Sequence, residues 1–246
     1  MRRFTITPER RHGDRVTFDH DESHHLARVL RLKAGDTVVA VDGTGRYYTV
    51  RLERVSAESM GTIVESRTRD AESPFPITLV QGLPKGDKLE AIIRAVTELG
   101  AARVVPVVTA RTVVRLDAGR GATRLVRWQR VGREAAKQCG RTRLPEIEAA
   151  RPLSTLIEAP ADATCLRLCF WEDQGAPLAD VIASLTSPPS AAIVIVGPEG
   201  GLTADEAGAA RAAGWRVVGF GPRVLRTETA GPAIVAALQF EFGDLG

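Results

Sequence analysis

Two glycine-rich turns near the C-terminus constrain the fold of this 246-residue chain more than any other feature of the sequence. The first, Gly-Pro-Glu-Gly-Gly at residues 197–201, follows the apolar stretch 191–196, and the second begins at Gly219, directly after the strand-like stretch 215–218. Glycine has no Cβ, so the main chain at such a turn can approach a ligand closely. In α/β proteins, ligands bind where parallel strands end in such turns. Each turn therefore predicts a strand, a ligand loop and a helix in succession.

Both turns lead into helix starts. Thr203 and Glu206 have the spacing of a capping box, and Pro232 fits the first turn of a final helix that continues through the apolar run 233–238. Tight packing of a helix on a sheet also requires glycine, so either turn by itself leaves that interpretation open. The first turn lacks the ending of a Walker phosphate loop and the spacing of a dinucleotide fingerprint, which excludes both devices.

Strands and helices alternate after residue 76, as in the βαβ units of a parallel sheet. From this pattern alone we expect an ordinary Rossmann-like α/β fold. The expected elements are strands at 77–81, 103–108 and 164–171, a helix at 87–99 closed by Gly100, and a helix at 177–185.

The first 72 residues have a different pattern, in which short strands are separated by turns. Asp42 and Gly43 begin a hairpin signal between two of these strands, and one helix is expected at 22–29 with Asp21 as its cap. Two prolines within 72–76 indicate a linker. We therefore expect a small, barrel-like β domain at 1–72 and a second domain at 73–246. The expected strands of the first domain are 15–18, 37–41, 47–52 and 61–65.

Basic residues are concentrated in the middle of the chain. Residues 94–151 contain 13 Lys or Arg and five Asp or Glu, whereas the whole chain has a net charge of only +3. A clustered basic surface is the usual sign of nucleic-acid binding. The excess of Arg over Lys suits phosphate recognition but equally fits codon bias, so the clustering carries the inference.

The helix expected at 120–138 has one apolar and one basic face. Leu125, Trp128, Val131 and Ala135 recur at helical spacing on the first face. A solvated surface explains the opposite face as well as RNA binding does, but its position beside residues 138–141 favours RNA contact. The basic face consists of Arg127, Arg130, Arg133 and Lys137.

Other patterns narrow the class of protein. No apolar run is long enough to span a membrane, and the N-terminus has no secretory signal, so we expect a cytoplasmic protein. Cys139, Cys165 and Cys169 form no Cys-x-x-Cys pair, and His24 and His25 lack the spacing of zinc ligands. We therefore expect no metal site.

Several motifs resemble those of the ribosomal RNA small-subunit methyltransferase E family. They are Gly-Pro-Glu-Gly-Gly at 197–201, Gly-Pro-Arg-Val-Leu-Arg-Thr-Glu-Thr-Ala at 221–230, Gln-Cys-Gly-Arg at 138–141 and Pro-Glu-Ile at 145–147, and the resemblance extends over essentially the whole chain. It implies a SPOUT-class methyltransferase domain with a trefoil knot, a mostly parallel sheet and an N-terminal PUA-like β-barrel. It also implies a homodimer that uses S-adenosylmethionine to methylate N3 of one uridine in the 16S ribosomal RNA of the 30S subunit.

The resemblance further implies which residues form the site. Arg226 and Glu228 are the expected catalytic pair: a cation that stabilises a developing uracil oxyanion, and a carboxylate that orients the base or takes a proton. The expected cofactor-binding residues are Phe170, Trp171, Glu172, Val196, Gly197, Pro198, Glu199, Gly200, Gly201, Phe220, Gly221, Leu225, Arg226, Thr227, Thr229 and Ala230. The expected RNA-binding residues are Arg2, Arg3, Arg28, Arg31, Arg127, Arg130, Gln138 and Arg141.

Alternatives remain open from the sequence. Glu228 and Glu199 also fit a role in bracing their loops, and no residue is an obvious general base. A catalytically silent RNA-binding factor would use the β domain and the basic helix without binding the cofactor. An α/β enzyme for a small anionic substrate would make no use of the arginines between Arg120 and Arg141.

Overall fold

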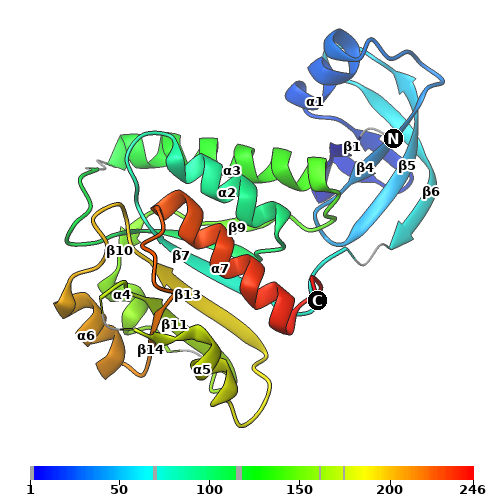
Figure 1. Cartoon of the computed structure of the whole chain (residues 1–246). Helices are drawn as coiled ribbons and strands as arrows, with labels where there is room; N and C mark the ends of the chain where they lie inside the picture. The colour runs from blue at the N-terminus through cyan, green and yellow to red at the C-terminus, as the bar shows by residue number, and fades with distance from the viewer. Residues whose placement is uncertain (1–2, 69–70, 115–117, 161, 174) are drawn as a thin grey trace. The chain divides into compact units, whose positions relative to one another are not determined.

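The computed structural model describes residues 3–68, 71–114, 118–160, 162–173 and 175–246 (Figure 1). Its contacts divide the chain into two units, Met1–Glu72 with Arg133–Leu144, and Ser73–Gly132 with Pro145–Gly246. The helix α3 (Ala118–Cys139) contributes to both of them. A segment from the middle of the chain therefore belongs with the N-terminal residues.

The strands of the first unit are β1 (Arg3–Thr5), β2 (Arg11–His12), β3 (Arg15–Thr17), β4 (Thr37–Val41), β5 (Arg46–Arg54) and β6 (Met60–Thr68). They form one sheet in the order β1-β4-β5-β6-β3-β2. All neighbours are antiparallel except β1 and β4. The hairpin predicted at Asp42 and Gly43 is confirmed, because β4 and β5 pair on either side of it. The buried core of the first unit includes Phe4, Phe18 and Tyr48.

The helix of this unit begins earlier than the sequence predicts. A 3-10 turn, η1 (Pro8–Arg10), comes first, and α1 (His20–His24) then continues into a π-helical turn, η2 (His25–Val29). Asp19, not Asp21, is the cap, because its side chain accepts a hydrogen bond from the Glu22 N–H at 2.8 Å. The prediction was wrong because Asp21 lies within the first turn, where a carboxylate favours the helix through its dipole instead.

The second unit contains one parallel sheet. Its strands are β7 (Ile77–Gly82), β8 (Arg103–Val108), β9 (Glu146–Ile147), β10 (Arg151–Pro152), β11 (Cys165–Phe170), β12 (Ala176–Pro177), β13 (Ala191–Val196) and β14 (Arg216–Gly219). They follow the order β10-β8-β7-β13-β11-β14-β12, with β9 paired to β8, and every pair is parallel. The carboxyl ends of β11, β13 and β14 therefore lie at the same edge of the sheet.

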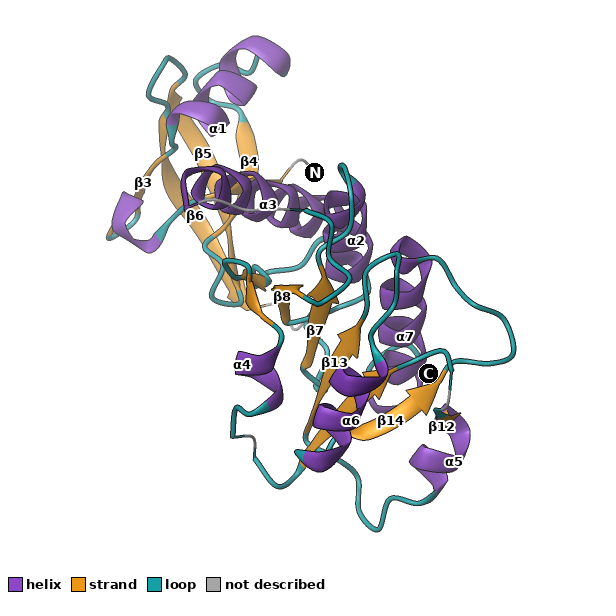
Figure 2. Ribbon diagram, turned by 90° about the vertical axis from the view of Figure 1, so that its left-hand side faces the viewer, coloured by secondary structure: helices purple, strands orange, loops and turns teal. Residues whose placement is uncertain are grey.

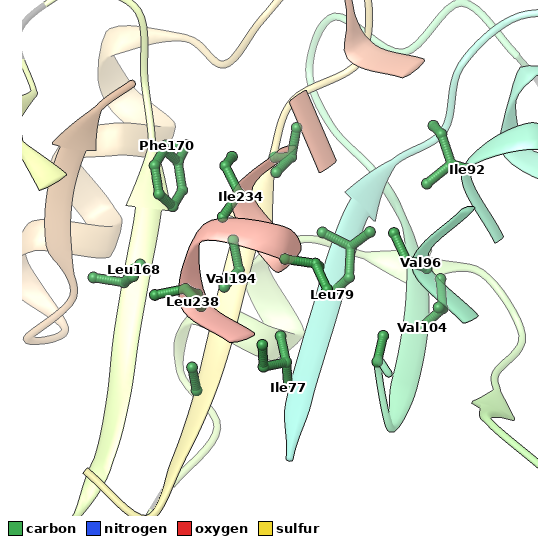
Figure 3. Packing of buried hydrophobic residues seen from close by; sticks show 14 of the residues in the cluster. Ile77, Leu79, Ile92, Val96, Val104, Leu168, Phe170, Val194, Ile234 and Leu238 are labelled. Carbon is green, nitrogen blue, oxygen red and sulfur yellow. The ribbon is translucent and has the colours of Figure 1, made fainter. Parts of the chain in front are cut away.

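Helices cover both faces of this sheet (Figure 2). They are α2 (Lys88–Glu98), α3, α4 (Ser154–Ile157), α5 (Leu178–Ala183), α6 (Ala204–Ala212) and α7 (Thr227–Phe242). Ile92 and Val96 of α2 pack with Ile234 and Leu238 of α7 on one face (Figure 3). Residues of α4 and α6 form a second buried cluster with the opposite face. The predicted helices at 87–99, 120–138 and 177–185 are confirmed to within two residues.

The final helix also begins earlier than predicted. Pro232 is its sixth residue, not part of its first turn. Proline has no N–H, so the Glu228 carbonyl receives no regular helical bond from it. The N-cap is Arg226, which follows the second glycine-rich turn directly. The second glycine-rich turn and the start of α7 are consequently continuous.

Candidate functional site

One cavity of about 490 Å³ lies at the carboxyl edge of the parallel sheet, where β11, β13 and β14 end. The end of β11, the turn after β13 and the loop between β14 and α7 all contribute to its wall. Lys88, in the first turn of α2, completes it. The lining residues are Lys88, Phe170, Trp171, Glu172, Val196, Gly197, Pro198, Glu199, Gly201, Val218, Phe220, Gly221, Pro222, Arg223, Val224, Leu225, Arg226, Thr227, Glu228, Ala230 and Ile234.

The turn at 197–201 packs closely on its neighbours. A Cβ on Gly82, at the end of β7, would lie 2.5 Å from the nitrogen of Pro198, so only glycine leaves room for the turn. Gly201 has a φ of +70°, in the left-handed region that favours glycine. Arg111 donates to the Gly200 carbonyl at 2.6 Å. The predicted capping box of Thr203 and Glu206 is present and starts the next helix.

A buried polar cluster ties the start of α7 to this turn. The Thr227 hydroxyl donates to the Gly197 carbonyl at 2.8 Å and accepts from the Gln81 side-chain amide at 2.9 Å. The same amide lies 3.2 Å from the Gly197 carbonyl. Gln81 is fully buried at the end of β7. Segments about 30 and 146 residues apart in the chain therefore meet at one point of the cavity wall.

Three charged side chains form a chain of contacts in the wall. The Lys88 Nζ lies 3.1 Å from Glu199 Oε1 and 3.3 Å from Glu228 Oε2. Glu199 also accepts from the Lys85 N–H at 3.0 Å. Burial opposes ionisation of Glu199, but its own backbone N–H, that of Lys85 and the Lys88 ammonium together lower its pKa. The backbone N–H of Glu228 and, more weakly, Lys88 and Arg226 lower the pKa of Glu228. Both carboxylates are therefore ionised at neutral pH.

The structure brings most of the predicted cofactor residues together in this one cavity. Gly200 and Thr229 are the two that do not line it: Gly200 packs beneath the side chain of Arg111, and the Thr229 N–H bonds the Arg226 carbonyl in the first turn of α7. The predicted catalytic pair, Arg226 and Glu228, lies in the wall.

The sequence analysis missed Lys88 in the cavity wall, and it missed Gln81 and Arg111, which bond to the turn at 197–201. Gln81 lies at the end of β7, Lys88 follows β7, and Arg111 follows β8. Because the carboxyl ends of parallel strands meet at one edge of a sheet, this position could have indicated that they lie near the site.

The predicted RNA-binding residues of the second unit lie on α3. Arg130 is exposed. Arg127 is half exposed and pairs with Glu90, 2.6 Å away, and with Asp87. Trp128, on the apolar face, is buried in the core as predicted.

In the first unit, residues of its N-terminal segment contact residues of its second segment, 133–144. The Arg3 guanidinium packs against Gly140, whose φ is +88°. Arg141 is buried and pairs with Glu72 at 2.7 Å, and the N–H groups of Thr142 and Arg143 donate to the same carboxylate. The exposed predicted residues here are Arg28, Arg31 and Gln138, and Arg2 lies outside the described residues.

Lys137 does not belong to the solvent-exposed basic face that was predicted for the helix at 120–138. Its side chain is only 9% exposed and lies 2.9 Å from Glu22 and 2.7 Å from Glu134. Glu22 is itself buried and accepts from the backbone and hydroxyl of Thr5. The helical pattern placed Lys137 with the solvated residues, but a buried carboxylate from a distant segment holds it inside the first unit.

The described residues contain no group of three or more His, Cys, Asp or Glu side chains arranged to hold a metal ion. Within the same ranges, none of the helices has both the length and the apolar character needed to cross a membrane.

Models of known protein families match both parts of the chain. The RNA methyltransferase domain matches residues 71–239, and the RNA methyltransferase PUA domain matches residues 18–60. The predicted SPOUT-type, knotted methyltransferase fold with a PUA-like domain is confirmed by these matches and by the solved structures below.

Individual proteins resemble the chain over nearly its full length. The ribosomal RNA small subunit methyltransferase E of Synechocystis is 34% identical over 96% of this chain and 77% of that protein. Its namesake from Bacillus subtilis is 33% identical over 90% and 88%. The crystal structure of the Neisseria gonorrhoeae protein of this name, bound to S-adenosylmethionine, has a TM-score of 0.91 and 32% identity and covers both chains completely. This chain belongs to the ribosomal RNA small subunit methyltransferase E family.

Proposed function

We propose that this protein transfers a methyl group from S-adenosylmethionine to N3 of one uridine in 16S ribosomal RNA. The observation that carries the proposal is that Arg226 and Glu228 lie in the wall of the same cavity as the predicted cofactor loops. In this proposal residues 1–72 form the RNA-binding PUA-like domain and residues 73–246 the methyl-transfer domain.

The cavity residues fit S-adenosylmethionine. Phe170, Val196, Phe220 and Leu225 offer apolar surface for an adenine ring. Within the described residues, the N–H groups of Val224 and Leu225 donate to no protein acceptor, which leaves them for a ligand. The cavity volume of about 490 Å³ is in the range of small-molecule sites. When bound, this cofactor supplies an activated methyl carbon.

The protein must orient uracil N3 and remove its proton. Glu228 is ionised, so its carboxylate accepts a hydrogen bond from N3–H and favours uracil over cytosine, whose N3 carries no hydrogen. Its lowered pKa makes Glu228 a weak base, so it would take the proton only as N3 bonds the methyl carbon and the carbon–sulfur bond of the donor breaks, leaving a neutral thioether. The proton would then pass from Glu228 to solvent. The guanidinium of Arg226 stabilises the negative charge that develops on the uracil oxygens.

The RNA must present the target base unstacked. In this proposal Arg3, Arg28, Arg31, Arg130 and the other predicted RNA-binding residues hold the phosphate backbone. We further propose that the protein acts as a homodimer on the 30S subunit in the cytoplasm.

The proposal is tested by mass spectrometry of 16S ribosomal RNA from a strain that lacks the gene. We expect N3-methyluridine to disappear and to return with the wild-type gene but not with Glu228→Gln. Persistence of the modified base in the deletion strain would refute the assignment. Calorimetry with S-adenosylmethionine separates it from a silent RNA-binding factor, which would bind RNA and release no heat with the cofactor.

A further inference from the structure

Lys88 is the one described side chain that contacts both Glu199 and Glu228, two of the three carboxylates in the cavity wall. It is the first residue of α2, whereas Glu199 belongs to the turn after β13 and Glu228 to the first turn of α7. Its ammonium therefore joins three segments that are far apart in the sequence. No motif in the sequence pointed to it.

Glu228 and Glu199 face different numbers of positively charged side chains. Two cations, Lys88 from α2 and Arg226 from the residue before α7, face it. Glu199 faces the same ammonium of Lys88 and the N–H of Lys85. The side chains of Lys88, Glu199 and Glu228 are 39%, 30% and 28% exposed, so solvent screens these interactions only in part. Without Lys88, the wall would keep Glu172, Glu199 and Glu228 and carry one cation fewer.

The position of Lys88 is not needed for the packing of α2. Leu89, Ile92, Ile93 and Val96 hold this helix in the core through their buried side chains. The contacts of Lys88 are instead the two ion pairs and a place in the cavity wall. Its loss should therefore change charge in the site and leave the helix in place.

We infer that Lys88 is a positioning residue for methyl transfer, which ties Glu228 to the Glu199 turn and keeps the Glu228 carboxylate charged as the acceptor for uracil N3–H. This inference rests on the proposed uracil N3 function. Lys88 contacts the group that acts on the base, and its positive charge widens, toward acid, the pH range over which that carboxylate is ionised.

The test compares Lys88→Met with Lys88→Arg in single-turnover methylation of 30S subunits across pH. Removing a cation within about 4 Å raises the pKa of a carboxyl, by about one unit at a partly exposed site. The acidic midpoint of the rate should rise by about that amount in Lys88→Met, and Lys88→Arg should restore it. Lys85→Met is the matched control, because Lys85 contacts Glu199 through its backbone N–H, which the substitution retains. Its midpoint should equal the wild-type value.

Two further measurements make the outcome decisive. Glu199→Gln leaves Lys88 to Glu228 alone, so its acidic midpoint should move below the wild-type value. A carbon-13 NMR titration of the Glu228 carboxyl in the folded protein follows the same change without requiring activity. An unchanged midpoint in Lys88→Met, or a rate loss accounted for entirely by weaker S-adenosylmethionine binding in calorimetry, would overturn the inference. Failure of the wild-type protein to form N3-methyluridine would refute the proposed function instead.

Discussion

The two glycine-rich loops of the cavity are held in different ways. The turn at 197–201 is fixed along its length, by Gly82 beneath Pro198, by Arg111 on Gly200 and by Lys85 and Lys88 on Glu199. The loop between β14 and α7 is anchored at its end, through Thr227. Within it Val224 is 81% exposed, and Arg223 and Arg226 are also exposed. The first loop is thus part of the folded framework, whereas the second leaves much of its length exposed at the cavity.

The largest effect should follow a change beneath the first loop. In Gly82→Ala the added Cβ meets the backbone of Pro198 and Gly197, which cannot move as a flexible side chain can. We expect a loss of about 2 kcal/mol in the free energy of unfolding, with at least tenfold weaker S-adenosylmethionine binding. Urea denaturation and calorimetry measure the two quantities.

The matched control is Gly208→Ala on α6, where the new Cβ has no atom within 4 Å. Its stability should be unchanged or higher by about 0.5 kcal/mol, because alanine favours a helix. Equal stability of the two variants would mean that the first loop is not held as tightly as the contacts indicate.

The anchor of the second loop comes next. Thr227→Val removes the hydroxyl that bonds Gly197 and Gln81, at a cost of about 1–2 kcal/mol for buried polar groups left with fewer partners. Thr227→Ser keeps the hydroxyl and should retain most of the stability. Thermal unfolding with and without S-adenosylmethionine distinguishes a loss of anchoring from a loss of packing. Identical behaviour of the valine and serine variants would contradict the anchoring role.

A smaller effect is expected from the carboxylate that holds the first loop. The pKa of Glu199 is lowered below the ordinary 4.5, so its contribution to stability is present above that pH and is lost as the pH falls through the lowered value. Glu199→Gln should therefore cost about 0.5 kcal/mol at pH 7 and nothing near pH 2, where Glu199 of the wild type is protonated in both the folded and the unfolded protein. Urea midpoints at both pH values test this, and a cost that persists in acid would point to packing rather than charge.

The smallest effect on stability should come from the exposed part of the second loop. Val224→Ser removes a side chain that is 81% exposed, so the free energy of unfolding should change by less than about 0.5 kcal/mol. A larger loss in urea denaturation of the dilute protein would show that this loop is held by more than its anchor.

Local patterns predicted much of this fold. The strand at 103–108, the helix at 87–99 and the capping box of Thr203 and Glu206 depend on neighbouring residues, and the structure contains all three. Predictions failed where distant segments decide the outcome. Glu22 holds Lys137 in the interior, and Thr227, where α7 begins before Pro232, bonds to Gly197 in a separate loop.

The candidate site divides in the same way. Gly201, Arg226 and Glu228 were expected in the site because their motifs resemble those of the family, and all three line the cavity. The pairing of Lys88 with Glu199 and Glu228 could not be predicted in this way, since Lys88 is more than 100 positions from each of them in the sequence.

The amino-acid sequence by itself determined the strand, turn and helix segments and the chemistry available at their ends, because backbone preferences and side-chain periodicity act over a few residues. The tertiary structure alone decided that β13 lies between β7 and β11, that three loops share one cavity, and that one lysine serves two carboxylates. Those contacts depend on strand order and burial, which arise only when segments distant in the sequence pack together.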